Sequence, residues 1–221
     1  MAIAAALGLK HRGALPHPNM ASMLSRIVEG VREVRRRRDL QGILVITTMY
    51  NIFGWPFYSL VPVIGKDSLG LGPEGIGVLS SMDGVGAMAG AAWVILLVRP
   101  AHYHTLYVSA CAAFQLMMIG FALVSQSLPA ATFLVLAGVS GACLSVMQTT
   151  LLYRAVAPEM RSRMMGLLVA SIGIGPLGFI ELGLLAELLG AKAAIIALAV
   201  QGLIALALTF PLWRPQRHGE G

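Results

Sequence analysis

The stretch Leu151–Ala191, LLYRAVAPEMRSRMMGLLVASIGIGPLGFIELGLLAELLGA, contains the features that decide the fold. One long apolar run ends at Tyr153-Arg154, a short basic loop continues to Arg163, and a second apolar run then begins. A helix needs about 20 mostly apolar residues to cross the hydrocarbon core of a bilayer, and both runs are of that length. Two such helices joined by a positively charged loop indicate a membrane hairpin with its turn in the cytoplasm.

The composition excludes an ordinary soluble protein. Of the 221 residues, 57% are hydrophobic and only 12% are charged, whereas soluble domains carry about 25% charged residues. The sequence has no His-Glu-x-x-His zinc motif, no glycine-rich phosphate loop and no Gly-x-Ser-x-Gly elbow. We therefore expect neither an enzyme nor a bound cofactor or metal. Cys111 and Cys143 each lie inside an apolar run and are expected to be small packing residues.

Hydropathy and turn residues predict six membrane-spanning helices, at about residues 40–64, 74–98, 102–124, 129–155, 162–189 and 191–213. The predicted fold is thus an all-α polytopic membrane protein with one six-helix bundle over residues 40–213 and a cytoplasmic tail over residues 214–221.

The region before the bundle, residues 1–39, is expected to be a cytoplasmic segment. Residues 22–39 are rich in arginine and apolar at helical spacing, which predicts a basic amphipathic helix that contacts anionic lipid headgroups rather than nucleic acid. Residues 1–21 are open to two interpretations: the end of a preceding helix with part of a linker, or the product of a spurious upstream start.

The placement of the basic residues predicts the orientation. If the N-terminus is cytoplasmic, 14 of the 16 Lys and Arg residues fall on the cytoplasmic side, and only Lys66 and Lys192 lie opposite. This asymmetry follows the positive-inside rule. It predicts that both termini are cytoplasmic, and it supports an even number of spanning helices.

Three segments carry a resemblance to the major facilitator superfamily of transporters. Residues 158–166, PEMRSRMMG, are similar to a basic segment before the eleventh helix of those proteins, and residues 175–178, GPLG, and 183–190, GLLAELLG, resemble the eleventh helix and its outer end. The resemblance covers roughly residues 24–213, as the C-terminal half of a transporter in the branch of drug and siderophore exporters that resemble the enterobactin exporter. It implies half of a 12-helix fold, built as two inverted three-helix repeats.

The resemblance also implies a function and partners. The function is secondary active transport, specifically proton-coupled efflux of a small organic molecule such as a drug or siderophore across a bacterial inner membrane. The implied partners are that substrate, protons, the lipid bilayer and a second six-helix half or a homodimer partner, without nucleic acid. Two alternatives stay open: a truncated, inactive transporter fragment, or a non-transporting membrane assembly or interaction protein.

Polar side chains deep in the spans are the candidates for a substrate and proton pathway. At about 1.5 Å per residue, Asn51 lies about 16 Å from the inner end of the first helix. On the same measure, Asp83 lies about 14 Å from the outer end of the second helix, and Glu181 about 12 Å from the outer end of the fifth. Gln148 is closer to the inner face and is a candidate for lining a cavity or bonding another helix.

The two carboxylates, Asp83 and Glu181, are the candidates for proton coupling. A charged residue at the bilayer centre costs about 2.5–3.5 kcal/mol on insertion scales, so it normally faces protein or water. No spanning segment offers Lys or Arg at their depth, and desolvation without a cation favours the protonated acid. The alternative is that each acid is permanently protonated and hydrogen-bonded to a neighbouring helix.

Small residues and prolines mark expected packing faces and breaks. Lipid supplies no hydrophobic drive for helix association, so close backbone contact between small residues must supply it. The candidates for such contacts are Gly86, Gly90, Gly138, Gly175, Pro176 and Gly178. Pro56 and Pro176 also lie inside predicted helices, where proline kinks the chain.

The loop Arg99–His104, RPAHYH, departs from the superfamily pattern. It keeps one arginine but lacks the acidic residue that usually accompanies the basic cluster there, which leaves a gating role for this loop open. His102 and His104 have no cysteine or carboxylate nearby in the sequence, so we expect a solvated loop rather than a metal site.

Overall fold

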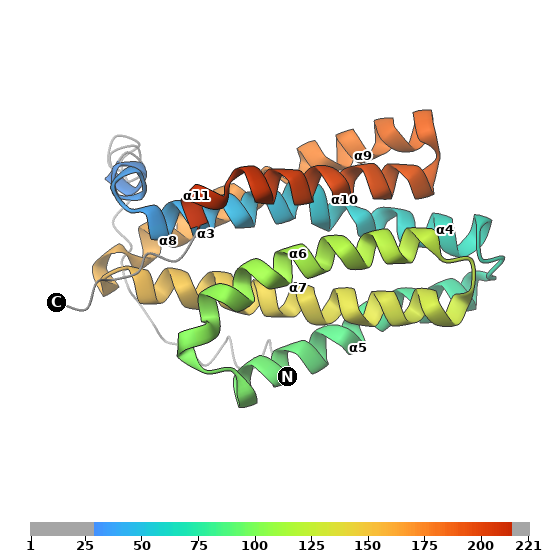
Figure 1. Ribbon diagram of the computed structural model, residues 1–221, viewed down its shortest axis with the longest axis horizontal. Helices are drawn as coiled ribbons and strands as arrows, with labels where there is room; N and C mark the ends of the chain where they lie inside the picture. Colours follow the sequence, from blue (N-terminus) through green and yellow to red (C-terminus); the bar gives the residue numbers. More distant parts are fainter. Residues whose placement is uncertain (1–28, 214–221) are drawn as a thin grey trace, which may run out of the picture.

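The computed structural model describes residues 29–213, and every described element is a helix. Figure 1 shows the helices running side by side along the long axis of the molecule. Six helical stretches are long and apolar enough to cross a membrane, namely Arg38–Asp67, Pro73–Leu97, Pro100–Leu123, Ser127–Ala155, Pro158–Leu189 and Ala191–Leu208. The prediction of an all-α protein with six spanning helices is confirmed.

The first span changes its winding three times. It consists of α3 (Arg38–Met49), a π-helical turn η1 (Tyr50–Gly54), a 3₁₀ segment η2 (Trp55–Leu60) and α4 (Val61–Asp67). Pro56 lacks a backbone N–H and its ring needs space in the preceding turn, so a regular α-helix cannot continue through it. The break expected at Pro56 therefore takes the form of a π turn followed by 3₁₀ turns.

The second, third and fourth spans are more regular. They comprise α5 (Pro73–Leu97), the short η3 (Pro100–His102) leading into α6 (Tyr103–Leu123), and α7 (Ser127–Ala155). Both Pro73 and Pro100 stand at the first position of their helices, where a missing N–H costs nothing because that donor has no partner inside the helix.

The last two spans are interrupted. The fifth contains η4 (Pro158–Met160), α8 (Arg161–Ile172) and α9 (Pro176–Leu189), and the sixth is α10 (Ala191–Leu208) followed by α11 (Phe210–Trp213). Residues 173–175, Gly-Ile-Gly, separate α8 from α9, and Pro176 begins α9, so the break lies where the sequence predicted it. The predicted sixth helix, 191–213, is interrupted at Thr209, because Pro211 has no N–H to donate to the carbonyl of Ala207, four residues earlier, and its ring needs space in that turn.

The N-terminal basic helix is also shorter than predicted within the described residues. Residues 29–36 are helical, and Arg37 is extended, so this helix is separate from α3. The predicted segment 1–21, residues 22–28 of the amphipathic helix and the tail 214–221 lie outside the described residues.

The spans pack in a repeating pattern. The second and third spans both pack on the fourth, and the fifth and sixth spans both pack on the first. The third and sixth spans also contact each other. Because consecutive spans alternate in direction, spans 1–3 and 4–6 run in opposite senses, which is the arrangement of two inverted repeats.

The core lies between the first, third, fourth and sixth spans. Its largest fully buried side chains include Phe57, Phe114, Phe121 and Tyr107. The ring of Phe57 packs edge to face with Phe114 and Phe121, and Phe114 packs in the same way with Tyr50. The second and fifth spans are the least buried: only 22% of the most apolar window of each lies inside the structure, compared with 44% for the first and third. One broad face of α5 and one of α8 and α9 are therefore free to meet lipid or another protein.

Candidate functional site

A buried polar junction joins the first, third and fourth spans. The hydroxyl oxygens of Thr47 and Tyr107 lie 2.8 Å apart, and both residues are fully buried. Tyr107 donates to the main-chain carbonyl of Ile43 at 2.9 Å, and Thr47 donates to Oε1 of Gln148 at 3.3 Å. Such bonds are favourable in a bilayer because few other partners are present. Gln148, a pathway candidate from the sequence, is thus an interhelical acceptor in this structure.

Asn51 lies in the π turn and is 7% exposed. Its Nδ2 donates to the main-chain carbonyl of Thr47 at 2.8 Å, one turn earlier in the same span. Its Cβ also faces Gly175 of the fifth span, where an added methyl would come within 3.9 Å. The structure therefore places Asn51 inside the first span's contact with the fifth, next to the polar junction.

Asp83 forms a polar contact between the first and second spans. It is half-buried in α5, about 15 Å along the helix from Pro73. The hydroxyl of Tyr58, carried by η2, donates to Oδ1 of Asp83 at 2.6 Å. This distance is in the range of hydroxyl donors to carboxylates. The irregular winding of the first span thus presents a proton donor to the deepest carboxylate of the second.

Glu181 lies in α9 and is also half-buried. Within residues 29–213 it makes no hydrogen bond or ion pair. Asp83 and Glu181 therefore belong to the two least buried spans, but no contact brings them together. Each lies on the middle span of its three-helix repeat.

Backbone contacts through glycine lock α5 to α7. A Cβ at Gly86 would overlap the main-chain carbonyl of Val135, and a Cβ at Gly90 would lie 2.6 Å from that of Val139. In the opposite direction, a Cβ at Gly138 would overlap the carbonyl of Asp83 itself. The main chain that carries the Asp83 carboxylate is therefore held directly by the fourth span.

A second glycine contact holds the fifth span to the first. A Cβ at Gly178 would overlap the carbonyl of Ile52 and would come 2.8 Å from the ring of Pro56. Gly175 lies close to the carbonyl of Asn51, where a Cβ would approach to 3.5 Å, and Pro176 begins α9 with an exposed ring. Two seams of small residues, between spans 2 and 4 and between spans 5 and 1, thus occupy equivalent places in the repeats.

A family model of the major facilitator superfamily, MFS_3, described as transmembrane secretion effector, matches residues 1–218. The chain belongs to this family. Together with the six apolar spans, membership makes the chain an integral, multi-pass membrane protein of the transporter class, with a small-molecule substrate and the bilayer as partners. A search of curated proteins found no match.

The sequence alone did not single out three residues of these polar contacts: Thr47, Tyr58 and Tyr107. The two tyrosines stand within apolar segments, where a hydroxyl in hydrocarbon needs a partner, and that rule could have identified them. The amide of Gln115 is 1% exposed, and neither of its polar atoms has a partner among the described residues.

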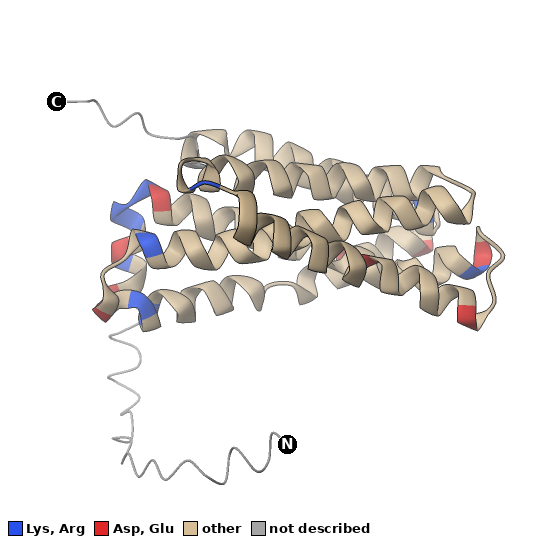
Figure 2. Cartoon of the chain, turned by 90° about the horizontal axis from the view of Figure 1, so that it is seen from below, with Lys and Arg blue, Asp and Glu red and all other residues tan. Residues whose placement is uncertain are grey.

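Charged groups of the transporter gather at the two ends of the bundle. Figure 2 shows most of the described Lys and Arg residues at the end where α7 stops and α8 begins. There, Arg163 pairs with Glu29 at 2.6 Å, and the guanidinium groups of Arg154 and Arg161 lie over the rings of Tyr103 and Tyr153. No group of three metal-binding side chains occurs within residues 29–213.

Proposed function

We propose that this protein supplies half of a proton-coupled secondary transporter that exports a small organic molecule, such as a drug or siderophore. In this proposal the chain lies in a bacterial inner membrane with both termini in the cytoplasm, as the 14-to-2 division of basic residues supports. The substrate would move between this six-helix unit and a second one, either a separate polypeptide or another copy of the chain.

One observation supports the proposal most strongly. The two least buried spans, the second and the fifth, each carry a half-buried carboxylate away from the ends of the bundle, Asp83 and Glu181. Ionisable groups at such depth are costly in lipid and mark pathways for substrates or ions. A second six-helix unit covering both faces would enclose the two carboxylates in a shared cavity.

The rest of the site is compatible with a proton cycle. Asp83 accepts a hydrogen bond from Tyr58 at 2.6 Å, so a neutral phenol is in place to stabilise the ionised acid. Glu181 has no such donor within the described residues, which leaves it accessible to a substrate or to water in an assembled cavity. The two carboxylates therefore differ in environment, as a proton carrier and a substrate contact would.

The test uses the full chain, purified and separated by size into single chains and larger assemblies, then reconstituted into liposomes with an imposed pH gradient. Ethidium, a fluorescent organic cation, serves as the probe. We expect gradient-driven ethidium movement from the assemblies and none from single chains, because a lone unit leaves the helices that carry Asp83 and Glu181 uncovered. Transport by monodisperse single chains would contradict the half-transporter part of the proposal.

Two variants test the role of the carboxylates. Asp83→Asn and Glu181→Gln keep the hydrogen-bonding shape but cannot titrate, so transport should lose its dependence on the pH gradient. Glu187→Gln is the matched control, because Glu187 is exposed and near the end of α9. If both test variants transport with the wild-type pH dependence, the carboxylates are structural. If no assembly moves ethidium or responds to a gradient, the fragment or interaction-protein interpretation is favoured.

A further inference from the structure

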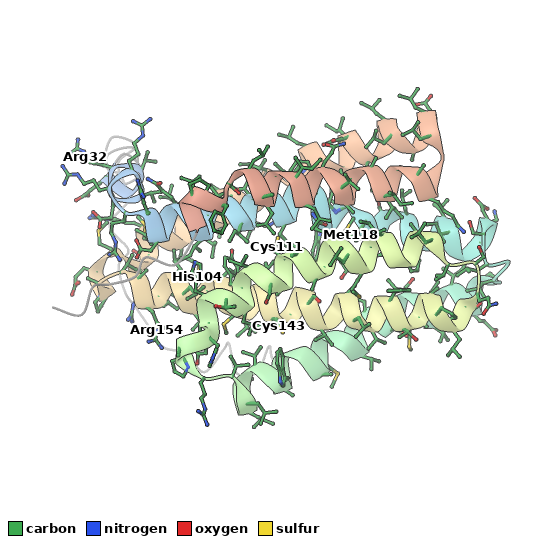
Figure 3. All side chains as sticks on the ribbon, in the orientation of Figure 1. Arg32, His104, Cys111, Met118, Cys143 and Arg154 are labelled. Atoms are coloured by element: carbon green, nitrogen blue, oxygen red, sulfur yellow. The ribbon has the colours of Figure 1, made fainter. Side chains whose placement is uncertain are left out.

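The bundle surface is hollowed where the second span ends and the third begins. The helices α5 and α6 barely touch, although they are consecutive, because α7 packs between them along most of their length. A groove of about 470 Å³ remains at the turn, and its lining includes Trp93, Leu97, Arg99, His102, Thr105 and Leu106. Figure 3 shows His104 and Arg154 at this same end of the bundle, and Cys111 and Met118 further along α6.

The groove is polar at the turn and apolar toward the membrane interior. Arg99 and His102 are exposed in the turn, and Thr105 adds a hydroxyl on the first turn of α6. Leu97 and Trp93 follow on α5, one helical turn apart, or about 6 Å along the axis. Their exposed fractions are 72% and 44%, so both present apolar surface. Tryptophan at this level is typical of the interface between headgroups and acyl chains.

Arg99 differs from the arginines that are already paired at this end. Arg37 and Arg163 form ion pairs with Asp39 and Glu29, and two further arginines lie over tyrosine rings. Within residues 29–213, Arg99 has no ion pair and no ring contact, and no Asp or Glu lines the groove. An exposed guanidinium beside an apolar groove is suited to a ligand that carries a phosphate on a hydrocarbon chain.

We propose that this groove binds one anionic glycerophospholipid, with its phosphate on Arg99 and one acyl chain against Leu97, Trp93 and Leu106. The neighbouring outward residues of α5, Ile95 and Leu96, are 75% and 76% exposed, so the groove opens on a strongly apolar face suited to lipid. A protein partner would need to supply both a matching acid and a long apolar ridge at this turn. The proposal does not depend on transport, because it concerns the outside of the unit.

The experiment measures lipid enrichment at Trp93. The chain has three tryptophans, so Trp55→Phe and Trp213→Phe leave Trp93 as the only emitter. The full chain is placed in phosphatidylcholine nanodiscs that contain a minor fraction of phosphatidylglycerol with brominated acyl chains, which quench nearby tryptophan. We expect quenching to correspond to about a fivefold local enrichment of phosphatidylglycerol, the factor that one basic residue contributes at an anionic membrane surface. Brominated phosphatidylcholine should quench only in proportion to its mole fraction.

Two variants at the same end of the bundle distinguish a specific lipid site from a general attraction of anionic lipid by basic residues. Arg99→Gln should abolish the enrichment, whereas Arg36→Gln should retain it, because Arg36 is exposed at this end but does not line the groove. Native mass spectrometry of the chain with its tryptophans intact, comparing retained phosphatidylglycerol and phosphatidylcholine with and without Arg99→Gln, gives a second measurement. Equal quenching by both lipids overturns the proposal, as does an equal loss in both variants. Absence of quenching by either lipid overturns it too, because acyl chains would then not reach Trp93.

Discussion

Replacing Gly138 with alanine tests how closely α5 and α7 must approach. A Cβ at this position would overlap the main-chain carbonyl of Asp83 and lie 2.9 Å from the main-chain nitrogen of Ala87. Neither atom belongs to a side chain that could rotate away. To restore an ordinary separation of about 3.5 Å from that carbonyl oxygen, α5 must therefore move away from α7 by about 1.4 Å.

The cost of that shift can be bounded. Overpacking of a close contact costs about 1–3 kcal/mol, and removing a glycine from a helix interior returns about 0.5–1 kcal/mol. We expect the upper end of the net range, about 2 kcal/mol, because the obstructing atoms are backbone. For a chain of this size, that corresponds to a fall in the unfolding midpoint of about 4–8 °C.

A thiol-reactive fluorescent dye provides the assay. The only two cysteines, Cys111 and Cys143, are free and 1% and 2% exposed, so the dye reports the temperature at which the helices separate. Gly84→Ala is the matched control, because a Cβ there meets nothing within 4 Å and should leave the midpoint unchanged or slightly raised. If Gly138→Ala unfolds at the wild-type temperature, or Gly84→Ala loses as much, the seam does not depend on backbone contact.

Two further outcomes are expected. Tyr58→Phe removes the described donor to Asp83. Because Asp83 is half-buried and water can partly replace the donor, the free energy of unfolding should fall by about 1 kcal/mol, which lowers the midpoint by about 2–4 °C in the same assay. A fall in the midpoint no larger than that of Tyr153→Phe, whose ring is exposed, counts against this contact. A membrane-impermeant thiol reagent added to intact cells should label Lys66→Cys at once and Arg161→Cys only after permeabilisation, and the reverse order would invert the proposed orientation.

The six spans could be predicted because apolar length is a local property of the sequence. Gly86, Gly90 and Gly138 could likewise be recognised as packing residues, since glycine within a spanning helix has few other uses. Which carbonyl each glycine contacts depends on the pairing of α5 with α7, and nothing in either helix alone specifies that pairing. The breaks near Pro56 and Pro176 were predictable, but the π turn at Tyr50–Gly54 was not.

The candidate site was predictable only in part. Asp83 and Glu181 were found because carboxylates are rare in apolar segments. The partner of Asp83 was not found, since Tyr58 lies 25 residues away and faces α5 only because of the winding of η2. Gln148 was assigned to a cavity or an interhelical bond without a partner, because Thr47 is 101 residues distant in the chain. Their depths were predictable from counting residues, but their neighbours depend on tertiary packing.

The π turn at Tyr50–Gly54 also sets the direction in which the later side chains of the first span point. A π turn holds one more residue than the α-helical turn it replaces, and the overwound 3₁₀ segment that follows partly offsets that change in phase. If the same residues were wound as an α-helical turn, every later side chain would be rotated by about 100° around the axis of the span. Tyr58 would then turn away from Asp83, although the sequence and the apolar length of the span would be unchanged. The winding of one turn, which hydropathy cannot detect, therefore decides whether the first and second spans share this polar contact.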